Sequence, residues 1–312
     1  MNKLISIRFQ WFWSDFDPYG NFFVHFLESE GYEVEVIRDK YAKVDVEFVS
    51  VFPPFRRKIN EKIQRWKSIE KVGFGDVSEK YNLEKFPDSR NYERRIWFTG
   101  ENLRPPLMEN FDAFLSYDLD PYENKNAYLP IWYLEVDFFG RKVSSRTGIH
   151  ISLNDLTANR KKIKIGNKFG VSFIGNQHPI RMQAIKHFSQ VQDIELFGSS
   201  VNRPVTEKFG IAKDFKFAFC FENDLYPGYV TEKLIDAYAC GNIPLYWGHL
   251  GFESIINPAS YINLADFKSI KDFRDFVLSL ENFDLLAIAN QPLLLKKPDF
   301  NDILTAITGS KN

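Results

Sequence analysis

The sequence predicts an α/β protein of two domains, each built on a mostly parallel sheet. The chain has 312 residues, which exceeds the usual size of a single hydrophobic core. Apolar strand-like runs alternate with helix-like segments along both halves, and this alternation is typical of a parallel sheet covered on both faces. One run, Phe215–Phe221, has no polar residue apart from Lys216, as expected of a strand buried on both faces.

The first half contains short β-branched and aromatic runs that are separated by turn residues, together with one apolar helical segment. The predicted strands are Lys3–Phe9, Glu33–Ile37, Val44–Val51, Arg95–Phe98 and Phe111–Tyr117, and the predicted helix is Asn21–Ser29.

The second half repeats the same alternation. Its predicted strands are Gly170–Ile174, Ile194–Phe197, Phe215–Phe221 and Ile243–Tyr246, and its predicted helices are Pro179–Phe188, Thr231–Ala239, Asp272–Leu280 and Pro292–Ile307.

A polar and basic stretch, Arg141–Asn167, has no sustained period and is therefore the best candidate for an interdomain connection. We accordingly expect an N-terminal domain over 1–150 and a C-terminal domain over 151–290. Residues 291–312 are expected to form a C-terminal helix whose packing the sequence does not define. Loops at the carboxyl ends of the strands would then face a shared cleft, where open α/β sheets bind ligands.

The composition excludes several classes of protein. Lys and Arg number 40 against 41 Asp and Glu, so the net charge of −1 gives no reason to expect a nucleic acid as partner. The two cysteines, Cys220 and Cys240, lie in apolar stretches and are expected to be buried free thiols. No signal peptide or membrane-spanning run is recognised, so we expect a cytoplasmic protein whose only membrane contact would be peripheral, at the inner membrane.

The most informative segment leaves a buried strand at Phe221 and enters a helix near Thr231, a residue type that caps helices. Glu232, in the first turn, suits the positive end of the helix dipole, whereas Lys233 opposes it. A lysine becomes favourable there if an anion such as a diphosphate binds at that helix end. A solvated surface lysine is the alternative interpretation.

Two further loops follow predicted strands. Gly100 permits a sharp turn that would leave Glu101 at the carboxyl edge of the first sheet, where one carboxylate can deprotonate a hydroxyl. Arg203 follows the Gly198–Ser199–Ser200 loop, a suitable place for a guanidinium that binds phosphate oxygens, and Arg181 is a weaker candidate of this kind. A loop salt bridge for Glu101 and a surface position for the arginines are the alternatives.

Other features carry less weight. Asp118 and Asp120 have the spacing of an Asp-x-Asp metal site, but such triplets are common by chance. The five histidines show no metal-ligand spacing. The aromatic cluster Trp11–Trp13 could stack on sugar rings, although aromatic clusters in a chain with 31 Phe residues usually belong to the core.

Taken together, the motifs resemble the signature of the α-1,3/4-fucosyltransferases. The family also carries the Thr99–Asn102 pattern, followed by a strand that ends in an acidic residue, as Tyr117–Asp118 does here. The resemblance extends from Arg95 to Gly248 and is similar to the soluble bacterial branch of the family. Its most specific segments are Phe221–Asn223, Tyr229–Lys233 and Ile243–Gly248.

The resemblance implies a GT-B architecture, in which two Rossmann-like domains face a central cleft. Glu101 then corresponds to the general base, Lys233 to the lysine that binds the diphosphate, and Arg203 to the arginine of the donor site. The residues that the resemblance assigns to donor binding are Arg203, Asn223, Tyr229, Glu232 and Lys233. Asp224–Pro227 and Cys240 do not match the family pattern, so another GDP-sugar stays open as the donor.

The expected activity is an inverting transfer of L-fucose from GDP-fucose to a glycan hydroxyl, O3 of GlcNAc in the resembled family, with no essential metal and no further cofactor. One alternative is a metal-dependent transferase that uses Asp118 and Asp120, which activity in EDTA would test. Another is a non-catalytic, lectin-like module, which would bind glycans without binding GDP.

Overall fold

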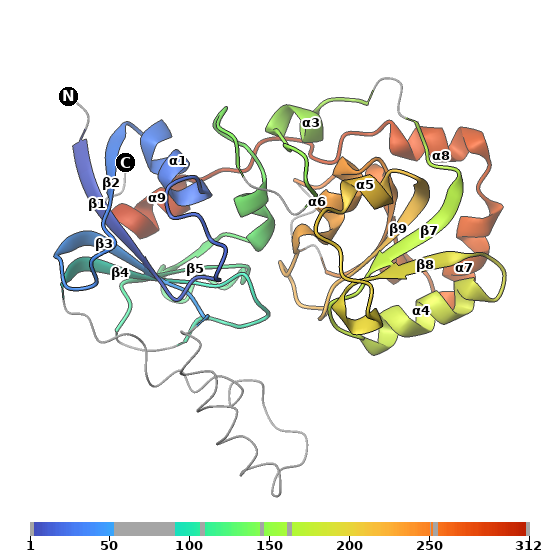
Figure 1. Ribbon diagram of the computed structural model, residues 1–312, viewed down its shortest axis with the longest axis horizontal. Coiled ribbons are helices and arrows are strands. Elements are labelled where there is room, and N and C mark those ends of the chain that lie inside the picture. The colour runs from blue at the N-terminus through green and yellow to red at the C-terminus, as the bar shows by residue number, and fades with distance from the viewer. Residues whose placement is uncertain are drawn as a thin grey trace, which may run out of the picture. The chain divides into compact units, whose positions relative to one another are not determined.

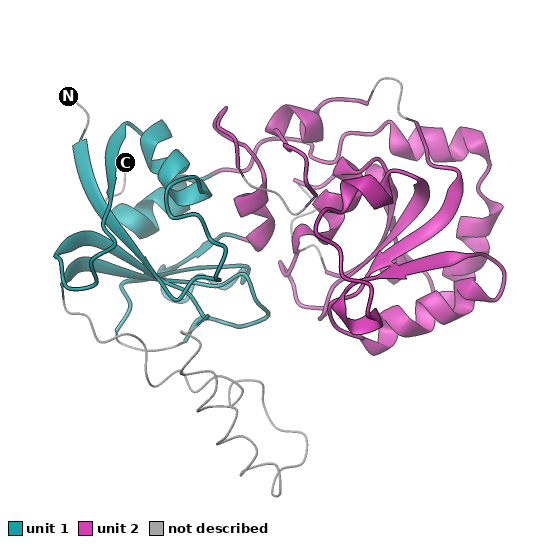
Figure 2. Cartoon of the chain, viewed as in Figure 1, with its two compact units in different colours: residues 1–129, 300–312 teal, residues 130–299 magenta. Residues whose placement is uncertain are grey.

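The computed structural model describes residues 3–52, 91–106, 110–143, 147–160, 164–249, 251 and 255–309. Figure 2 colours the two compact units into which the chain divides. Unit 1 comprises Met1–Leu129 and Phe300–Asn312, and unit 2 comprises Pro130–Asp299. Each unit contains one parallel sheet, which confirms the predicted fold class of two α/β domains.

Unit 1 contains a six-stranded sheet in the order β2-β1-β3-β4-β5-β6, and all of its printed strand pairs are parallel. Helices α1 and α9 lie near one another beside this sheet (Figure 1). The elements are β1 (Lys3–Gln10), α1 (Phe22–Ser29), β2 (Tyr32–Val36), β3 (Val44–Val49), β4 (Tyr92–Phe98), β5 (Ala113–Ser116), β6 (Asn126–Tyr128) and α9 (Asn301–Thr308).

Aromatic packing joins α1 and α9 of unit 1. Asn21 caps α1 by accepting hydrogen bonds from the amides of residues 23 and 24, and Phe22 and Phe26 on α1 are buried. The rings of these two residues lie 5.5 and 5.7 Å from that of Phe300, which immediately precedes α9. The C-terminal segment therefore completes the core of the N-terminal sheet.

A buried ion cluster crosses the same sheet. Glu47 on β3 is fully buried and pairs with Arg8 on β1 at 2.8 Å and with Arg95 on β4 at 3.0 Å. Because a buried charge is costly unless it is paired, this carboxylate fixes the relation of three neighbouring strands.

Unit 2 contains a five-stranded parallel sheet in the order β11-β10-β9-β7-β8. Its strands are β7 (Lys168–Phe173), β8 (Ile194–Phe197), β9 (Phe215–Phe221), β10 (Ile243–Trp247) and β11 (Ile262–Asn263). Its helices are η3 (Ile131–Glu135), α3 (Leu153–Thr157), α4 (Pro179–Ser189), η4 (Ser199–Val201), α5 (Phe209–Ala212), α6 (Glu232–Ala239), η5 (Pro258–Ser260), η6 (Leu264–Asp266), α7 (Ile270–Ser279) and α8 (Asn282–Ala289).

The core of unit 2 follows from the side-chain alternation of β9. Phe217, Phe219 and Phe221 lie in one buried cluster with Phe188 of α4 and Phe273 of α7. Helix α6 contacts the same sheet through β9 and β10. With helices on both faces, β9 is apolar apart from Lys216, as the sequence predicts.

Several sequence expectations require correction. The boundary expected at residue 150 lies between Leu129 and Pro130, and the expected connection Arg141–Asn167 lies within unit 2. The reason is that η3 packs on α6, and Asp137 forms a β-bridge with Ser152.

The C-terminal helix is also shorter than predicted, because it begins at Asn301 instead of Pro292. Pro298 within the interval lacks an amide hydrogen and disfavours helical geometry in the residue before it.

Two other expectations concern the cysteines and membrane-spanning helices. Cys220 and Cys240 are free and buried, as predicted. Within the described ranges, no helix combines the length and the apolar character needed to cross a bilayer.

Candidate functional site

The candidate site in unit 2 lies where the strand order reverses. From β7 the chain runs to β8 on one side and then returns to β9 on the other side of β7 (Figure 1). Ligands of open α/β sheets bind beside the carboxyl ends of the strands at such a switch point. The loop that follows β9, residues 222–231, therefore occupies the expected place for a ligand.

Three side chains of this loop and of the start of α6 form a compact cluster. Glu222, directly after β9, is fully buried, and its Oε1 accepts a hydrogen bond from the amide of Thr231 at 2.9 Å. Its Oε2 accepts one from the Thr231 hydroxyl at 2.7 Å and one from Lys233 Nζ at 3.1 Å. Lys233 Nζ also donates to the Thr231 hydroxyl at 2.7 Å. The lysine that the sequence predicts as an anion ligand thus belongs to a defined polar cluster.

The helix start agrees with the prediction, because Thr231 is the N-cap residue of α6. Its side chain makes no capping hydrogen bond to the helix and instead bonds Glu222. The side chain that would ordinarily satisfy a first-turn amide is therefore turned away from the helix end, which suits an anion that accepts from those amides.

The charges around Lys233 keep it protonated. Burial by itself would lower the pKa of Lys233, but the carboxylates of Glu222 and Glu232 outweigh burial and raise that pKa above its ordinary value. The Lys233 side chain is 21% exposed, whereas that of Glu222 is completely buried. Lys233 is therefore the more accessible member of this ion pair.

Arg181, the weaker of the two arginine candidates, holds the strand end in place. It is buried, and its guanidinium donates to the carbonyl oxygens of Asn176, at 2.8 Å, and of Phe221. It also lies 3.5 Å from Asn223 Oδ1. Burial lowers the pKa of Arg181, and Glu222 opposes that effect. Arg181 therefore joins the loop after β7 to the loop after β9.

The other predicted donor residues of this loop lie close by in sequence. Tyr229 is buried, while Asn223 and Glu232 are partly exposed. Gly228 has a φ of 85°, which favours glycine, and its amide donates to His249 O at 3.2 Å. The turn thus joins the loop after β9 to the loop after β10.

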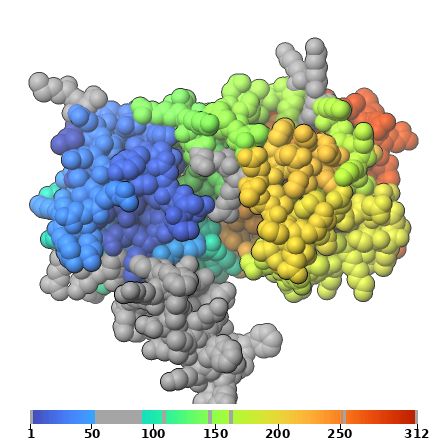
Figure 3. Space-filling view, in the orientation of Figure 1, coloured from blue at the N-terminus to red at the C-terminus, as the bar shows by residue number. Residues whose placement is uncertain are grey.

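Arg203 lies apart from the Lys233 cluster in its contacts. Its guanidinium lies 4.0 Å from the ring centre of Phe197, donates to Leu196 O at 3.2 Å, and pairs with Glu195 at 3.5 Å. Its side chain is 52% exposed. Figure 3 colours the surface of the segment around residue 200 yellow. No contact recorded between described residues links it to Lys233.

Glu101 lies in unit 1, after β4, at the carboxyl edge of that sheet. Its amide donates a hydrogen bond to Oγ1 of the buried Thr99 at 3.0 Å, and its carbonyl oxygen accepts one from Leu103 N at 2.7 Å. The residue is exposed. In the described part of the chain, no hydrogen bond or ion pair occupies the Glu101 carboxylate, so the loop presents an acid–base group on a fixed backbone.

Asp118 and Asp120 organise a turn. The buried Asp118 accepts hydrogen bonds from the Tyr122 hydroxyl at 2.5 Å and from Asp120 N at 3.1 Å, and Asp120 accepts from Tyr122 N at 2.8 Å. Asn126 donates to the carbonyl oxygens of both aspartates. Throughout the described residues, no group of three or more potential metal ligands is found.

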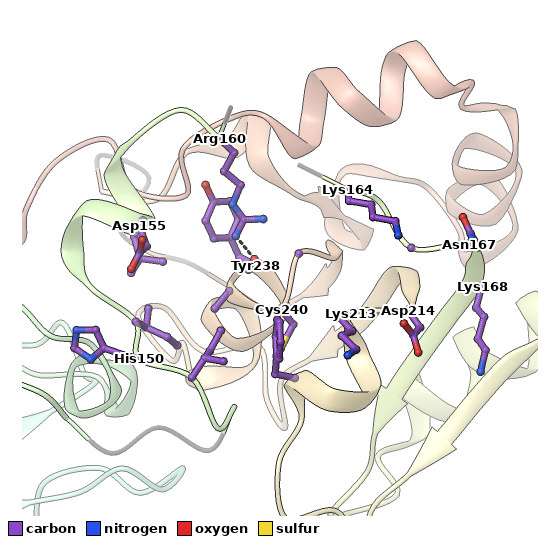
Figure 4. A pocket seen from close by; sticks show the side chains of 17 residues that line it. His150, Asp155, Arg160, Lys164, Asn167, Lys168, Lys213, Asp214, Tyr238 and Cys240 are labelled. Carbon is purple, nitrogen blue, oxygen red and sulfur yellow. Dashed lines mark hydrogen bonds between the residues drawn. The ribbon is translucent and has the colours of Figure 1, made fainter. Parts of the chain in front are cut away.

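A pocket of about 890 Å³ lies elsewhere in unit 2. It is lined by Lys168 at the start of β7, by Asp214 just before β9, and by Gly241 just before β10, so it lies at the amino edge of the sheet. Figure 4 shows Arg160 beside the ring of Tyr238. The Arg160 guanidinium also donates a hydrogen bond to the backbone oxygen of Tyr238. The Lys233 cluster lies at the opposite edge, so this pocket is not the predicted donor site.

Sequence patterns give little weight to Glu222 and Arg181, yet the structure buries both at the carboxyl end of β9. The available signal was the charged residue that follows the apolar run Phe215–Phe221, since a charge at the end of a buried strand needs a partner.

Comparisons with known proteins show a likeness in sequence and fold. Residues 158–285 match the family model described as glycosyltransferase family 10 (fucosyltransferase) C-term. The chain is 29% identical over 208 residues to the α-(1,3)-fucosyltransferase FucT of Helicobacter pylori, covering 59% of this chain and 43% of the relative. It is 24% identical over 214 residues to 3-galactosyl-N-acetylglucosaminide 4-α-L-fucosyltransferase FUT3 of Bos taurus, covering 66% and 54%. The chain thus spans about half the length of these curated relatives.

Solved structures extend the likeness to almost the whole chain. A crystal structure of an α1,3-fucosyltransferase with GDP-fucose superposes with a TM-score of 0.65 at 19% identity, covering 99% of this chain and 90% of that one. A second, with GDP, gives a TM-score of 0.66 at 20% identity, with 100% and 92% covered.

The two parallel-sheet units and this likeness define a protein of the GT-B fold class. Within that class, residues 158–285 match the C-terminal model of the family 10 fucosyltransferases, and the chain is similar in sequence to α-1,3-fucosyltransferases.

Proposed function

We propose that this protein transfers L-fucose from GDP-fucose to a glycan hydroxyl, O3 of GlcNAc, with inversion at the anomeric carbon. The observation that carries the proposal is the position of Lys233, whose charged side chain lies at the first turn of α6, beside the carboxyl end of β9. That is the place where an α/β sheet binds a diphosphate. The similarity to the family 10 fucosyltransferases then indicates which sugar is transferred.

In the proposed step, the acceptor hydroxyl attacks C1 of fucose while the bond from C1 to the β-phosphate oxygen breaks. Glu101 takes the proton of the acceptor hydroxyl, and GDP leaves with the bonding electron pair. A single base and a single displacement give inversion. The exposed Glu101 carboxylate on its hydrogen-bonded turn suits the role of general base.

The donor site is assigned to unit 2. Lys233 and Arg203 are proposed to stabilise the charge that grows on the departing diphosphate, a task that a divalent metal ion performs in other transferases. Asn223, Tyr229 and Glu232 are proposed to contact the donor. Arg203 follows β8 at the same sheet edge, and its 52% exposed side chain is accessible to a ligand.

The test is GDP release from GDP-fucose in EDTA, with and without N-acetyllactosamine. Acceptor-dependent release would support the reaction, the donor and metal independence together. GDP binding by calorimetry without release would retain the donor site and indicate another GDP-sugar or acceptor. If neither release nor binding occurred, the proposal would be wrong.

A further inference from the structure

Glu222 is the most constrained charged residue near the proposed donor site. It is fully buried, and its amide donates to Trp247 O at 2.8 Å on the neighbouring strand. Gly248 leaves room for it, because a Cβ at that position would lie 2.9 Å from Glu222 Cγ. Both the backbone and the side chain of Glu222 are therefore held.

Both carboxylate oxygens of Glu222 are directed at the start of α6. Oε1 receives the Thr231 amide, and Oε2 receives both the Thr231 hydroxyl and the Lys233 ammonium. Lys233 Nζ then reaches the Thr231 hydroxyl as well. An ammonium has three N–H donors, and these contacts account for two of them. Between described residues no hydrogen bond uses the third donor, and the Lys233 side chain is 21% exposed, so both are available to a ligand.

Stability alone does not account for this arrangement. A fully buried carboxylate is expensive, and a buried ion pair often contributes no more to stability than apolar residues of the same size. The arrangement does restrict Lys233, a long side chain that otherwise loses much rotamer freedom when it binds a ligand. A lysine that is fixed in advance binds a phosphate at a smaller entropic cost.

We propose that Glu222 is a positioning residue for the donor diphosphate, acting through Lys233. It holds the ammonium at the first turn of α6 and keeps Thr231 turned away from the helix amides, so that the charge and the helix end face the same phosphates. This inference rests on the proposed donor-binding function.

A pH effect accompanies this geometry. Besides burial, the groups that act on Lys233 are Glu222 after β9, Glu232 on its own helix, and Arg181 on α4. Burial and Arg181 lower the pKa of Lys233, whereas the two glutamates raise it. Of the two glutamates, Glu222 has the larger effect on the pKa of Lys233. Replacing Glu222 with Gln therefore lowers that pKa, and GDP affinity then begins to fall at a lower pH than in the wild-type protein.

The experiment is GDP binding by isothermal calorimetry, from neutral to strongly alkaline pH, on the full chain. The variants are Glu222→Gln, Glu222→Asp, Lys233→Ala and the double variant Glu222→Gln/Lys233→Ala. Glu47→Gln is the matched control, because Glu47 is another fully buried, ion-paired carboxylate, in the other unit. Circular dichroism establishes that each variant is folded.

We expect Glu222→Gln to raise the dissociation constant of GDP about tenfold, the effect of one charge-assisted hydrogen bond, and to shift the alkaline loss of affinity to lower pH. In the Lys233→Ala background the same change should have less than about a twofold effect, because the residue acts through the lysine. Glu222→Asp, which keeps the charge but shortens the side chain, should bind GDP more weakly with the wild-type pH profile. Glu47→Gln should leave affinity and profile unchanged.

The inference is overturned if Glu222→Gln binds GDP with the wild-type affinity and pH profile, or if its effect is undiminished in the Lys233→Ala background. If Glu222→Gln does not fold, Glu222→Asp decides, and wild-type affinity for that variant overturns the inference. A wild-type protein that binds no GDP would instead refute the proposed function.

Discussion

Replacement of Gly198 by Ala tests the local geometry that shapes the site loops. Gly198 follows β8 and has a φ of 119°, a region that residues other than glycine rarely adopt. A Cβ there would lie 2.3 Å from the carbonyl oxygen of Ile174 and 2.8 Å from its amide nitrogen. Those backbone atoms already bond Ser200 and Phe197, so they cannot move without breaking hydrogen bonds.

The expected loss of stability has two parts. The backbone strain costs about 1–3 kcal/mol, and displacing packed neighbours costs about 1–3 kcal/mol more. We therefore expect Gly198→Ala to lose roughly 4 kcal/mol, which for a domain of this size lowers the midpoint of thermal unfolding by about 8–16 °C.

The assay is thermal unfolding followed by circular dichroism, with Gly175→Ala as the matched control. Gly175 adjoins Ile174, but a Cβ at position 175 meets nothing within 4 Å, and its φ is not positive. The control should therefore unfold close to the wild-type midpoint. A Gly198→Ala midpoint within about 2 °C of that control would refute the reasoning.

Three further predictions concern charged groups. Glu101→Gln should lower turnover by about 10²–10⁴-fold while leaving GDP affinity unchanged; steady-state kinetics with calorimetry checks this, and a fully active variant would remove Glu101 from the role of base. Burial, aided by Arg181, lowers the pKa of His178, so the unfolded chain binds the proton more readily and stability falls as the pH drops below about 6.5. His178→Gln should flatten that loss in urea unfolding, and an equally steep loss would contradict it. Lys208→Met should cost about 3–5 kcal/mol in urea unfolding, because it removes the ammonium that pairs with the buried Asp236; a loss below about 1 kcal/mol would show that the pair is dispensable.

Local sequence patterns determined the secondary structure well. The apolar run Phe215–Phe221 and the shorter Ile194–Phe197 coincide with β9 and β8 at both ends. Thr231 is the N-cap of α6, as predicted. These features depend on side-chain periodicity and on backbone preferences of neighbouring residues, which are written in the sequence itself.

Features that depend on contacts between distant parts of the sequence were not predicted. The C-terminal segment returns to unit 1, where Phe300 packs against Phe22 and Phe26. That choice depends on which apolar surface is left uncovered by the rest of unit 1. The boundary after Leu129 also depends on distant packing, because η3 packs on α6 and Asp137 forms a β-bridge with Ser152.

The sequence by itself determined the fold class, most of the strands, the likeness to the fucosyltransferases and the place of Lys233 at the start of a helix. The tertiary structure decided which charges are buried and what they contact. Glu222 is buried and bonds Trp247 of β10 and Lys233 of α6. Arg181 is buried and bonds Phe221 of β9, while Arg203 is exposed. The physical reason is that the cost of a charge depends on burial and on partners, and both are set by residues that only folding brings together.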